Sequence, residues 1–428
     1  MLDVAFIREN PDAVKKGIAA KNTDPALVDR FLELDTQWRS LTQQFDEQRA
    51  LQKKLGAEKK VDEAKALKEK IKEVEASLAE AEKARLELLY QIPNLAFDDV
   101  PVGKNEEGNQ VIRTWGNPPE FDFKPKDHMA LGEALNLIDT KVASEVSGSR
   151  FNYLKGDLAR MEYALVSYVF SLLSDPAFIK TMAAKIGPDF PATPFVPVVP
   201  PVMIKPEIFT RMARLDPSTQ DERFYLPKDD LYLVGSAEHT LGPMHMDETI
   251  PESALPLRYV GFSTAFRREA GSYGKDVHGI LRVHQFDKLE IESFSLPELS
   301  RQEQDFIVSI QEYLVQSLNL PYRVVAVCTG DMGGPDARQL DIETWMPGQN
   351  AYRETHTSDL MTDYQSRRLK TRVKRAADGK TELVHMNDAT VFAIGRILIA
   401  IVENYQTKEG TIRIPEALQP FLGKKEIV

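Results

Sequence analysis

Apolar residues recur alternately three and four positions apart from about residue 27 to residue 92, in a segment without proline. The segment is also dense in Ala, Glu, Lys, Leu and Gln, and this combination predicts a coiled coil. Its two apolar seams consist of Phe31, Leu34, Trp38, Leu41 and Phe45, and of Ala64, Leu67, Ile71, Val74, Leu78, Ala81 and Leu88. Because Gly56 lies between the seams, we expect a helical hairpin that turns near residues 55–61 and extends about 45 Å. Such an arm either dimerises the protein through a solvated, charged coiled coil, which is the commoner use, or binds a nucleic acid.

The pattern changes after Pro93, where a connector rich in turn residues begins. Helical periodicity returns over residues 127–174, interrupted by a turn and a short strand, and again near residues 297–318 and 389–406. A proline-rich run, residues 188–209, predicts an extended edge or interface segment that leads into a helix around residues 206–214. The remaining β-branched runs predict strands at residues 231–235, 255–266, 279–294, 322–331 and 339–347. Helices and strands do not alternate regularly, so we expect an α+β domain with a mostly antiparallel sheet flanked by helices.

Composition adds limits to this picture. The chain has 428 residues, 42% of them apolar, which is enough for a substantial core divided between two or three domains. Its formal charge of −11 means that any nucleic-acid contact must come from local basic patches. The single cysteine, Cys328, excludes an internal disulfide framework and a cysteine-based zinc site, and its apolar neighbours predict a core residue. With no membrane-spanning run and no signal-peptide pattern at its start, the chain is expected in the cytoplasm.

The richest candidate chemistry lies in two strand-like runs from Phe266 to Glu290, around a glycine-bearing loop. Period-2 alternation predicts that Arg267 and Glu269 share one face, and that Arg282, Phe286 and Glu290 share another. Guanidinium groups suit phosphate, a flat ring suits a base and carboxylates suit amines, so this set favours a nucleotide substrate. A solvated hairpin with cross-strand ion pairs explains the segment equally well. Neither GxxxxGK[ST] nor GxGxxG occurs, so ATP would not be bound by a P-loop or a Rossmann motif.

Two further groups point to ligands. In residues 339–372, the carboxylates Asp341, Glu343 and Glu354 are followed by the hydroxyls of Thr355, Thr357 and Ser358, and such oxygen ligands suit Mg²⁺. Solvated acidic residues on a strand would look the same. Glu238, beside Ser236, could bind an ammonium group or cap a turn.

One charged residue interrupts the apolar helix predicted at 389–406. Arg396 would be buried there, which is costly without a partner, and a core ion pair with Glu403 is one solution. The seven histidines form neither an HExxH pair nor a catalytic-triad spacing, so the sequence does not indicate covalent catalysis by the protein.

Taken together, these segments resemble the bacterial-type seryl-tRNA synthetases, a family of class II aminoacyl-tRNA synthetases. The resemblance covers essentially the whole chain, including MLDVAFIRENPDAVKKGIAAK, VSGSRFNYLKGDLARME and TGDMGGPDARQLDIETWMPGQNAYRE. The three class II motifs are recognised around Pro200 and Pro201, in FRREAG…RVHQF, and in the helix with Gly395 and Arg396. The resemblance implies a tRNA-binding domain at residues 1–105, with its arm at about 27–92, and a class II catalytic domain at residues 106–428.

The resemblance also implies a reaction, in which ATP activates L-serine to seryl-adenylate and serine is then transferred to the end of tRNA-Ser. In this mapping Arg267 and Arg396 are the catalytic residues. The implied ATP-binding residues are Arg267, Arg268, Glu269, Arg282, Phe286, Glu354, Thr355, His356, Thr357 and Arg396. The implied serine-binding residues are Ser236, Ala237, Glu238, Arg267, Glu290 and Thr390, and Glu354 with Thr357 would bind Mg²⁺.

The implied partners are tRNA-Ser, held by its long variable arm, and a second copy of the chain in a homodimer. Basic residues at the tip of the arm, Lys53, Lys54, Lys59 and Lys60, are the candidate phosphate contacts. Whether a selenocysteine tRNA is also served stays open. One alternative is a ligase that loads an amino acid onto a carrier protein; known ligases of this kind lack the arm. The other is a non-catalytic tRNA-binding paralogue, which should have lost Arg267, Glu354 or Arg396.

The chain departs from the family pattern around the amino-acid site. Ser236 replaces a threonine, Leu360 an asparagine, and Asp388 with Ala389 an Asn-Gly pair; residues 242–246 also differ. These changes leave the implied ligands in place but alter the loops that carry them.

Overall fold

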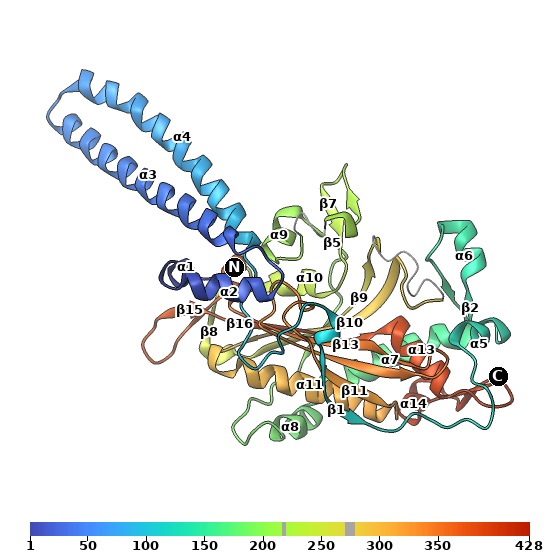
Figure 1. Cartoon of the computed structure of the whole chain (residues 1–428). Coiled ribbons are helices and arrows are strands. Elements are labelled where there is room, and N and C mark those ends of the chain that lie inside the picture. The colour runs from blue at the N-terminus through green and yellow to red at the C-terminus, as the bar shows by residue number, and fades with distance from the viewer. Residues whose placement is uncertain (216–219, 270–278) are drawn as a thin grey trace. The chain divides into compact units, whose positions relative to one another are not determined.

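A computed structural model of the chain describes residues 1–215, 220–269 and 279–428, which form two compact units, Met1–Ala96 and Phe97–Val428 (Figure 1). The tip of the hairpin predicted between Phe266 and Glu290, residues 270–278, lies outside the described residues, as does the AG of the second motif. No helix within the described residues combines the length and hydropathy needed to cross a membrane.

The smaller unit is helical and confirms the predicted coiled-coil hairpin. Its helices are α1 Val4–Glu9, α2 Pro11–Ala20, α3 Ala26–Ala57 and α4 Val61–Gln91. The helices α3 and α4 lie side by side along their length and are joined by a turn at residues 58–60, within the predicted range (Figure 1). Near the base, the fully buried Asp35 forms ion pairs of 2.7 Å with Arg8 and with Arg85. This pairing ties α1, α3 and α4 together, because a buried carboxylate needs such partners.

The larger unit is built on an eight-stranded sheet in the order β1-β11-β12-β13-β16-β10-β9-β4. Its strands are β1 Gln110–Trp115, β4 Val196–Val198, β9 Leu257–Phe266, β10 Gln285–Ser295, β11 Tyr322–Ala326, β12 Arg338–Met346, β13 Ala351–Thr362 and β16 His385–Ala393. Every neighbouring pair is antiparallel except β4 with β9, so the expected mostly antiparallel sheet is confirmed.

Small sheets and helices surround this sheet. The remaining strands are β2 Ile138–Asp139, β3 Tyr153–Leu154, β5 Met203–Ile204, β6 Tyr225–Leu226, β7 Leu231–Leu233, β8 Thr249–Pro251, β14 Arg372–Lys374, β15 Thr381–Leu383, β17 Ile412–Arg413 and β18 Glu426–Ile427. The helices are α5 His128–Ala134, α6 Thr140–Ser147, α7 Gly156–Leu173, α8 Pro176–Ala184, α9 Pro206–Arg211, α10 Glu238–Leu241, α11 Ser300–Ser317, α12 Tyr364–Leu369, α13 Ile394–Asn404 and α14 Gln419–Leu422.

The two faces of the large sheet differ in character. One face packs its apolar residues, among them Leu289, Ile291 and Val391, against α7, α11 and α13 to form the main hydrophobic core. Side chains alternate between faces along a strand, so the residues between these apolar positions project from the opposite face. On β10 and β16 those alternate residues are charged or polar, and they carry the candidate site.

Two boundaries differ from the sequence-based expectations, and one expected segment is confirmed. The helix predicted at 389–406 begins only at Ile394, because the preceding residues extend β16 as a central strand. The proline-rich run does form an extended edge segment, β4, followed by α9. Residues 97–105, which were assigned to the arm domain, pack with the larger unit: the amide of Phe97 donates to Ala337, and that of Thr329 donates to Pro101.

Candidate active site

A cavity of about 220 Å³ opens over the polar face of the sheet. Side chains from three adjacent strands and from the start of α13 line it. These residues are Phe286 and Lys288 on β10, Glu354, Thr357 and Asp359 on β13, Asp388, Thr390 and Ala393 on β16, and Gly395 and Arg396 on α13. Arg214, Glu238, Arg267, Glu269 and residues 280–283 complete the lining. The cavity therefore brings together charged residues of the second and third class II motifs.

Two β-bulges explain how the strands place their residues here. Strict alternation would put Glu354 and Thr357, three positions apart, on opposite faces. The pairing of β12 with β13 skips Thr355, which is an extra residue in β13, so Glu354 and Thr357 both reach the cavity. The pairing of β10 with β16 skips Val391 in the same way, and Thr390 and Ala393 both reach it.

The strands β13 and β16 also separate next to the cavity. Their pairing ends at Ser358 and Ala389. Beyond that point the side-chain amide of Gln311, on α11, donates to the carbonyls of Thr357 at 2.8 Å and Thr390 at 2.7 Å. The buried glutamine thus satisfies backbone groups that would otherwise lack partners where the strands part.

At one end of the cavity lie the arginines of the predicted nucleotide site. The guanidinium of Arg267 stands 5.4 Å from the ring centre of Phe286 and donates to the carbonyl of Gly235 at 3.1 Å. Arg282 and Glu269 line the same end. These residues come together as predicted, but not through strand alternation: β9 ends at Phe266 and β10 begins at Gln285, and Glu269 has a left-handed φ of +50°.

Arg396 completes this end, and its surroundings overturn one expectation. Its side chain is 25% exposed and forms an ion pair of 3.1 Å with Glu354, not with Glu403. Glu403 instead accepts hydrogen bonds from the backbone amides of His128 and Gly348. Arg396 lies at the first turn of α13, where the cavity meets solvent, so it is not sealed in the core.

Glu354 is the carboxylate best placed to bind a cation. Burial would raise its pKa, but the charges of Arg396, Lys288 and Arg267 lower it overall, so the group stays ionised. Among the described residues no group of three or more histidine, cysteine or acidic side chains is arranged to hold a metal ion. One carboxylate and the Thr357 hydroxyl suit Mg²⁺, which binds few protein ligands and keeps water and substrate phosphates in its shell. Asp341, Glu343 and Ser358, predicted alongside them, do not line the cavity.

Three residues predicted to contact ATP lie elsewhere. Thr355 is fully buried, with its hydroxyl 2.7 Å from that of Thr344 and 2.8 Å from Nδ1 of His356. His356 is equally buried, and burial lowers its pKa to about 3. Arg268 lines a neighbouring cavity and donates to the carbonyl of Arg223. The bulge at Thr355 and the irregular chain after β9 turn these side chains away.

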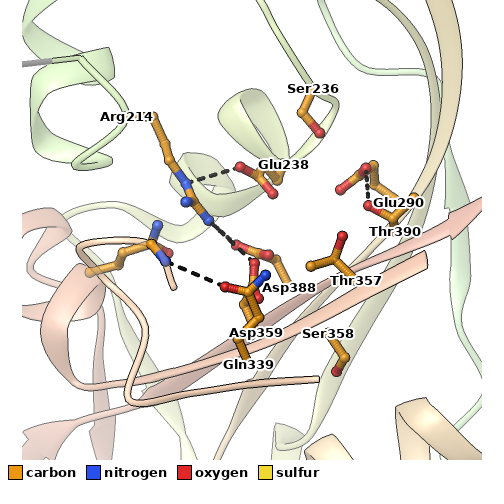
Figure 2. Close-up of polar contacts among 12 residues, drawn as sticks. Arg214, Ser236, Glu238, Glu290, Gln339, Thr357, Ser358, Asp359, Asp388 and Thr390 are labelled. Carbon is orange, nitrogen blue, oxygen red and sulfur yellow. Dashed lines mark hydrogen bonds and ion pairs between the residues drawn. The ribbon is translucent and has the colours of Figure 1, made fainter. Parts of the chain in front are cut away.

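The other end of the cavity is acidic and centres on Glu238, the first residue of α10. Its Oε1 forms an ion pair of 2.9 Å with Nε of Arg214 (Figure 2) and lies 3.5 Å from Nε2 of His239. Burial alone would raise the pKa of Glu238, but Arg214 and His239 hold it well below its usual range. Burial also lowers the pKa of His239 to about 3, so its ring is neutral. Since the amide of Gly235 donates to Nδ1 of that ring, the proton is on Nε2, toward Glu238.

Glu290 and Thr390, predicted to bind a hydroxyl group, face each other across β10 and β16. The Thr390 hydroxyl donates to Oε1 of Glu290 at 3.0 Å, and Lys288 contacts the same oxygen and donates to Ser236 at 3.1 Å. Oε2 of Glu290 is buried and has no hydrogen-bond partner in the structure. Thr390 lines the cavity, whereas Glu290, Ser236 and Ala237 are almost completely buried beside it and do not.

A row of acidic residues crosses the sheet beside this pair. Glu292, Asp388 and Asp359 occupy facing positions on β10, β16 and β13. Burial, reinforced by mutual repulsion, raises the pKa of each well above its usual value. Both carboxyl oxygens of Glu292 are buried without a hydrogen-bond partner. Glu292, whose oxygens have no hydrogen-bond partner, is therefore the member of the row that holds a proton most readily, whereas Asp388 is paired with Arg214.

Sequence reasoning missed four charged residues of the cavity: Arg214, Lys288, Asp359 and Asp388. A signal existed for Lys288, because a strand that alternates Lys288, Glu290 and Glu292 with apolar residues must bury those charges on one face. Asp359 and Asp388 are each two residues from a predicted ligand. Nothing local marked Arg214, which the chain reversal at Ala213, φ +58°, brings to the site.

The four lysines predicted to bind tRNA lie together at the end of the arm. Lys53, Lys54, Lys59 and Lys60 are exposed, and Lys60 forms an ion pair of 2.9 Å with Glu58. They surround the turn between α3 and α4 and make a small basic surface in an acidic protein.

Comparisons with known proteins agree with this arrangement. Residues 1–96 match the model of the seryl-tRNA synthetase N-terminal domain, and residues 223–405 match that of the tRNA synthetase class II core domain (G, H, P, S and T). The serine–tRNA ligase of Petrotoga mobilis is 40% identical, covering 100% of both chains, and that of Dictyoglomus turgidum is 40% identical, covering 100% of this chain and 99% of the relative. The crystal structure of seryl-tRNA synthetase from Pyrococcus horikoshii complexed with ATP superposes with a TM-score of 0.88 at 35% identity, covering 100% of this chain and 99% of that one.

Proposed function

The chain belongs to the seryl-tRNA synthetase family of class II aminoacyl-tRNA synthetases, and from this premise we propose how its cavity carries out the family reaction. As a serine–tRNA ligase, it joins L-serine to AMP, using ATP, and then transfers serine to the 3′ end of tRNA. The observation that carries this proposal is that one cavity is lined at one end by arginines around Phe286 and at the other by Glu238, Asp359 and Asp388 around Arg214. ATP fits the first end by charge, and the ammonium and hydroxyl groups of serine fit the second.

At the nucleotide end, Phe286 stacks on adenine and Glu269 accepts a hydrogen bond from its amino group. Arg267 binds the α-phosphate, and Arg396 covers the other face of the base and reaches the γ-phosphate. Mg²⁺, when bound by Glu354 and Thr357, would neutralise phosphate charge. The family resemblance implies these roles, and the charges support them, since fixed guanidinium groups stabilise negative charge that grows on the phosphates during reaction.

The chemical step needs no nucleophile from the protein. A carboxylate oxygen of serine attacks the α-phosphorus, the bond to the β-phosphate bridging oxygen breaks, and pyrophosphate leaves. A ribose hydroxyl of the tRNA then attacks the carbonyl carbon of seryl-adenylate and releases AMP. Catalysis comes from alignment of the two reactants and from Arg267 and Arg396 opposite the phosphates.

At the amino-acid end, Glu238 binds the ammonium group and Glu290 with Thr390 binds the hydroxyl. Oε2 of Glu290, which lacks a partner, is the acceptor for that hydroxyl. Alanine would leave this buried oxygen unpaired, which disfavours its binding, whereas threonine must be excluded by its extra methyl group.

The proposed macromolecular partners are tRNA-Ser and a second copy of the chain, and the proposed compartment is the cytoplasm. The basic arm tip suits the phosphates of the long variable arm of tRNA-Ser. Val196 on β4, Val199 just beyond it and Met203 on β5 are 55%, 81% and 44% exposed, as expected of an interface between two subunits. We place the boundary between the arm domain and the catalytic domain after Ala96, where the two compact units divide, in place of residue 105, and leave selenocysteine tRNA as a further candidate substrate. The presence of the arm, and of Arg267, Glu354 and Arg396, argues against the carrier-protein ligase and the non-catalytic paralogue.

Amino-acid-dependent exchange of pyrophosphate into ATP tests the first step. The purified protein with Mg²⁺ should support exchange with L-serine, and exchange with L-alanine or L-threonine should be at least about 100-fold weaker. Absence of serine-dependent exchange, or equal exchange with alanine, would refute the proposal.

Charging of tRNA tests the role of the arm. Lys53→Ala with Lys54→Ala should weaken charging of tRNA-Ser several-fold and reduce its salt dependence, without changing serine-dependent exchange. Lys180→Ala with Lys185→Ala, two exposed lysines of the larger unit, is the matched control and should change neither. Equal effects of the two pairs would show that the arm tip is not a specific contact.

A further inference from the structure

Arg214 occupies a central position in the acidic end of the cavity. Besides its ion pair with Glu238, its Nη2 lies 2.8 Å from Oδ2 of Asp388 and 4.0 Å from Oδ2 of Asp359 (Figure 2). The side chain is only 15% exposed, yet it lines the cavity. Its Nη2 donates a hydrogen bond to Asp388, and its Nε contacts Glu238 as an ion pair without hydrogen-bond geometry, so Asp388 orients the guanidinium beside Glu238.

Two contacts of the Glu238 carboxylate end on the same oxygen. Arg214 and the neutral His239 both approach Oε1. In Figure 2 the second oxygen of Glu238 points away from Arg214. The carboxylate is therefore held by one oxygen, and the other is presented in a defined direction.

We propose that Arg214 is a positioning residue for the amino-acid substrate: anchored on Asp388, it holds Oε1 of Glu238 and leaves Oε2 for the substrate's ammonium group. The inference rests on the proposed binding of serine at this end. Asp388 lies two residues before Thr390 on β16, so the ion-pair chain Asp388–Arg214–Glu238 connects the hydroxyl site with the ammonium site. This chain of ion pairs fixes the position of the ammonium site relative to the hydroxyl site.

Kinetics of pyrophosphate exchange test this role. Arg214→Ala should raise KM for L-serine at least about tenfold and leave KM for ATP within about twofold of its value, because only the amino-acid end loses its alignment. Millimolar methylguanidinium should partly restore KM for serine, since it can fill the space left by the side chain. Asp388→Asn, which removes the anchor's charge, should raise KM for serine by a smaller factor.

Arg211→Lys is the matched control. Arg211 lies three residues earlier, on α9, with an ion pair of 3.0 Å to Asp247, and it does not line the cavity. Its substitution should leave both KM values unchanged, whereas Arg214→Lys, which keeps the charge but loses the planar fork, should raise KM for serine.

Several outcomes would overturn the inference. A fall in KM for serine in Arg214→Ala would show that Arg214 competes with the substrate for Glu238, and equal changes in both KM values would indicate a general structural role. If Arg214→Ala does not fold, Arg214→Lys and Asp388→Asn decide, and an unchanged KM for serine in both refutes positioning. If the unmodified enzyme shows no serine-dependent exchange, the proposed function fails instead.

Discussion

The two ends of the cavity differ in their charge. The nucleotide end gathers Arg267, Arg282 and Arg396 with two carboxylates, Glu269 and Glu354, so positive charge exceeds negative charge there. The amino-acid end gathers five buried carboxyl groups around Arg214 and Lys288, and protons and ion pairs neutralise most of their charge; these groups are Glu238, Glu290, Glu292, Asp359 and Asp388. The first end is suited to a polyanion and the second to a small zwitterion.

The difference also shows how each end is made specific. An anion with several oxygens can be bound by any arginines at the right distance. These arginines can be partly exposed at the cavity mouth, because the ligand supplies the negative charge that pairs with them. A single ammonium and a single hydroxyl require acceptors with fixed directions, which only buried and fully supported groups provide. We therefore expect substitutions at the first end to affect rate, and substitutions at the second to affect the choice of amino acid.

Arg267→Ala should have the largest effect. Loss of the guanidinium at the α-phosphate should lower serine-dependent exchange by about 10³-fold or more, since it removes charge stabilisation from the reacting group. The adjacent Arg268 lines a different cavity, so Arg268→Ala should cost less than about tenfold in the same assay. Equal losses in the two variants would contradict the assignment of Arg267 to the nucleotide end.

Thr390→Val should have a smaller effect, confined to the choice of amino acid. We expect kcat/KM for serine to fall by about 10²-fold while that for alanine changes little, because the lost hydroxyl supports Glu290 at the serine side chain. Thr355→Val removes a buried hydroxyl that does not line the cavity; it should lower Tm without changing the preference for serine over alanine. If Thr390→Val lowered exchange with both amino acids equally, the hydroxyl site would have to be placed elsewhere.

Glu292→Gln should have the smallest effect, visible in the pH dependence of stability. The raised pKa of Glu292 means that the folded state keeps a proton that the unfolded state loses above the ordinary carboxyl range. The contribution of Glu292 to the free energy of unfolding does not depend on pH below that range. Above it, this contribution falls as pH rises, by up to about 1.4 kcal/mol per pH unit. The neutral glutamine has no such dependence. In thermal unfolding from pH 5 to pH 9, the Tm of the variant should therefore rise relative to that of the unmodified protein as pH increases. A difference in Tm that does not change with pH would contradict a protonated Glu292.

The sequence predicts much of this molecule, for reasons specific to each part. The arm depends on local periodicity, so its seams and its turn could be read directly, with Phe31, Ile71 and Ala81 buried as expected. The charged residues of the second and third motifs could be assigned through the family resemblance. Their convergence in one cavity followed from that assignment, although the period-2 argument for Arg267 and Glu269 was wrong because both residues lie beyond the end of β9.

What could not be predicted depends on pairing between distant strands. The bulges at Thr355 and Val391 appear only when β13 and β16 meet their neighbours, and they decide that Thr357 reaches the cavity while Thr355 and His356 do not. Arg214 lies outside every motif and reaches Asp388 only through the tertiary fold. Its role needed the structure, since a lone arginine after a short helix carries no local signal.

The most direct measurement is calorimetric titration with a stable seryl-adenylate analogue in which a sulfamoyl group replaces the phosphate. If one cavity holds both reactants, the analogue should bind at least about 10²-fold more tightly than AMP or L-serine alone, because joining the two parts removes the cost of binding the second. The corresponding alanyl analogue should bind more weakly than the seryl one. A seryl analogue that binds no more tightly than AMP would contradict a shared cavity with a nucleotide end and a serine end.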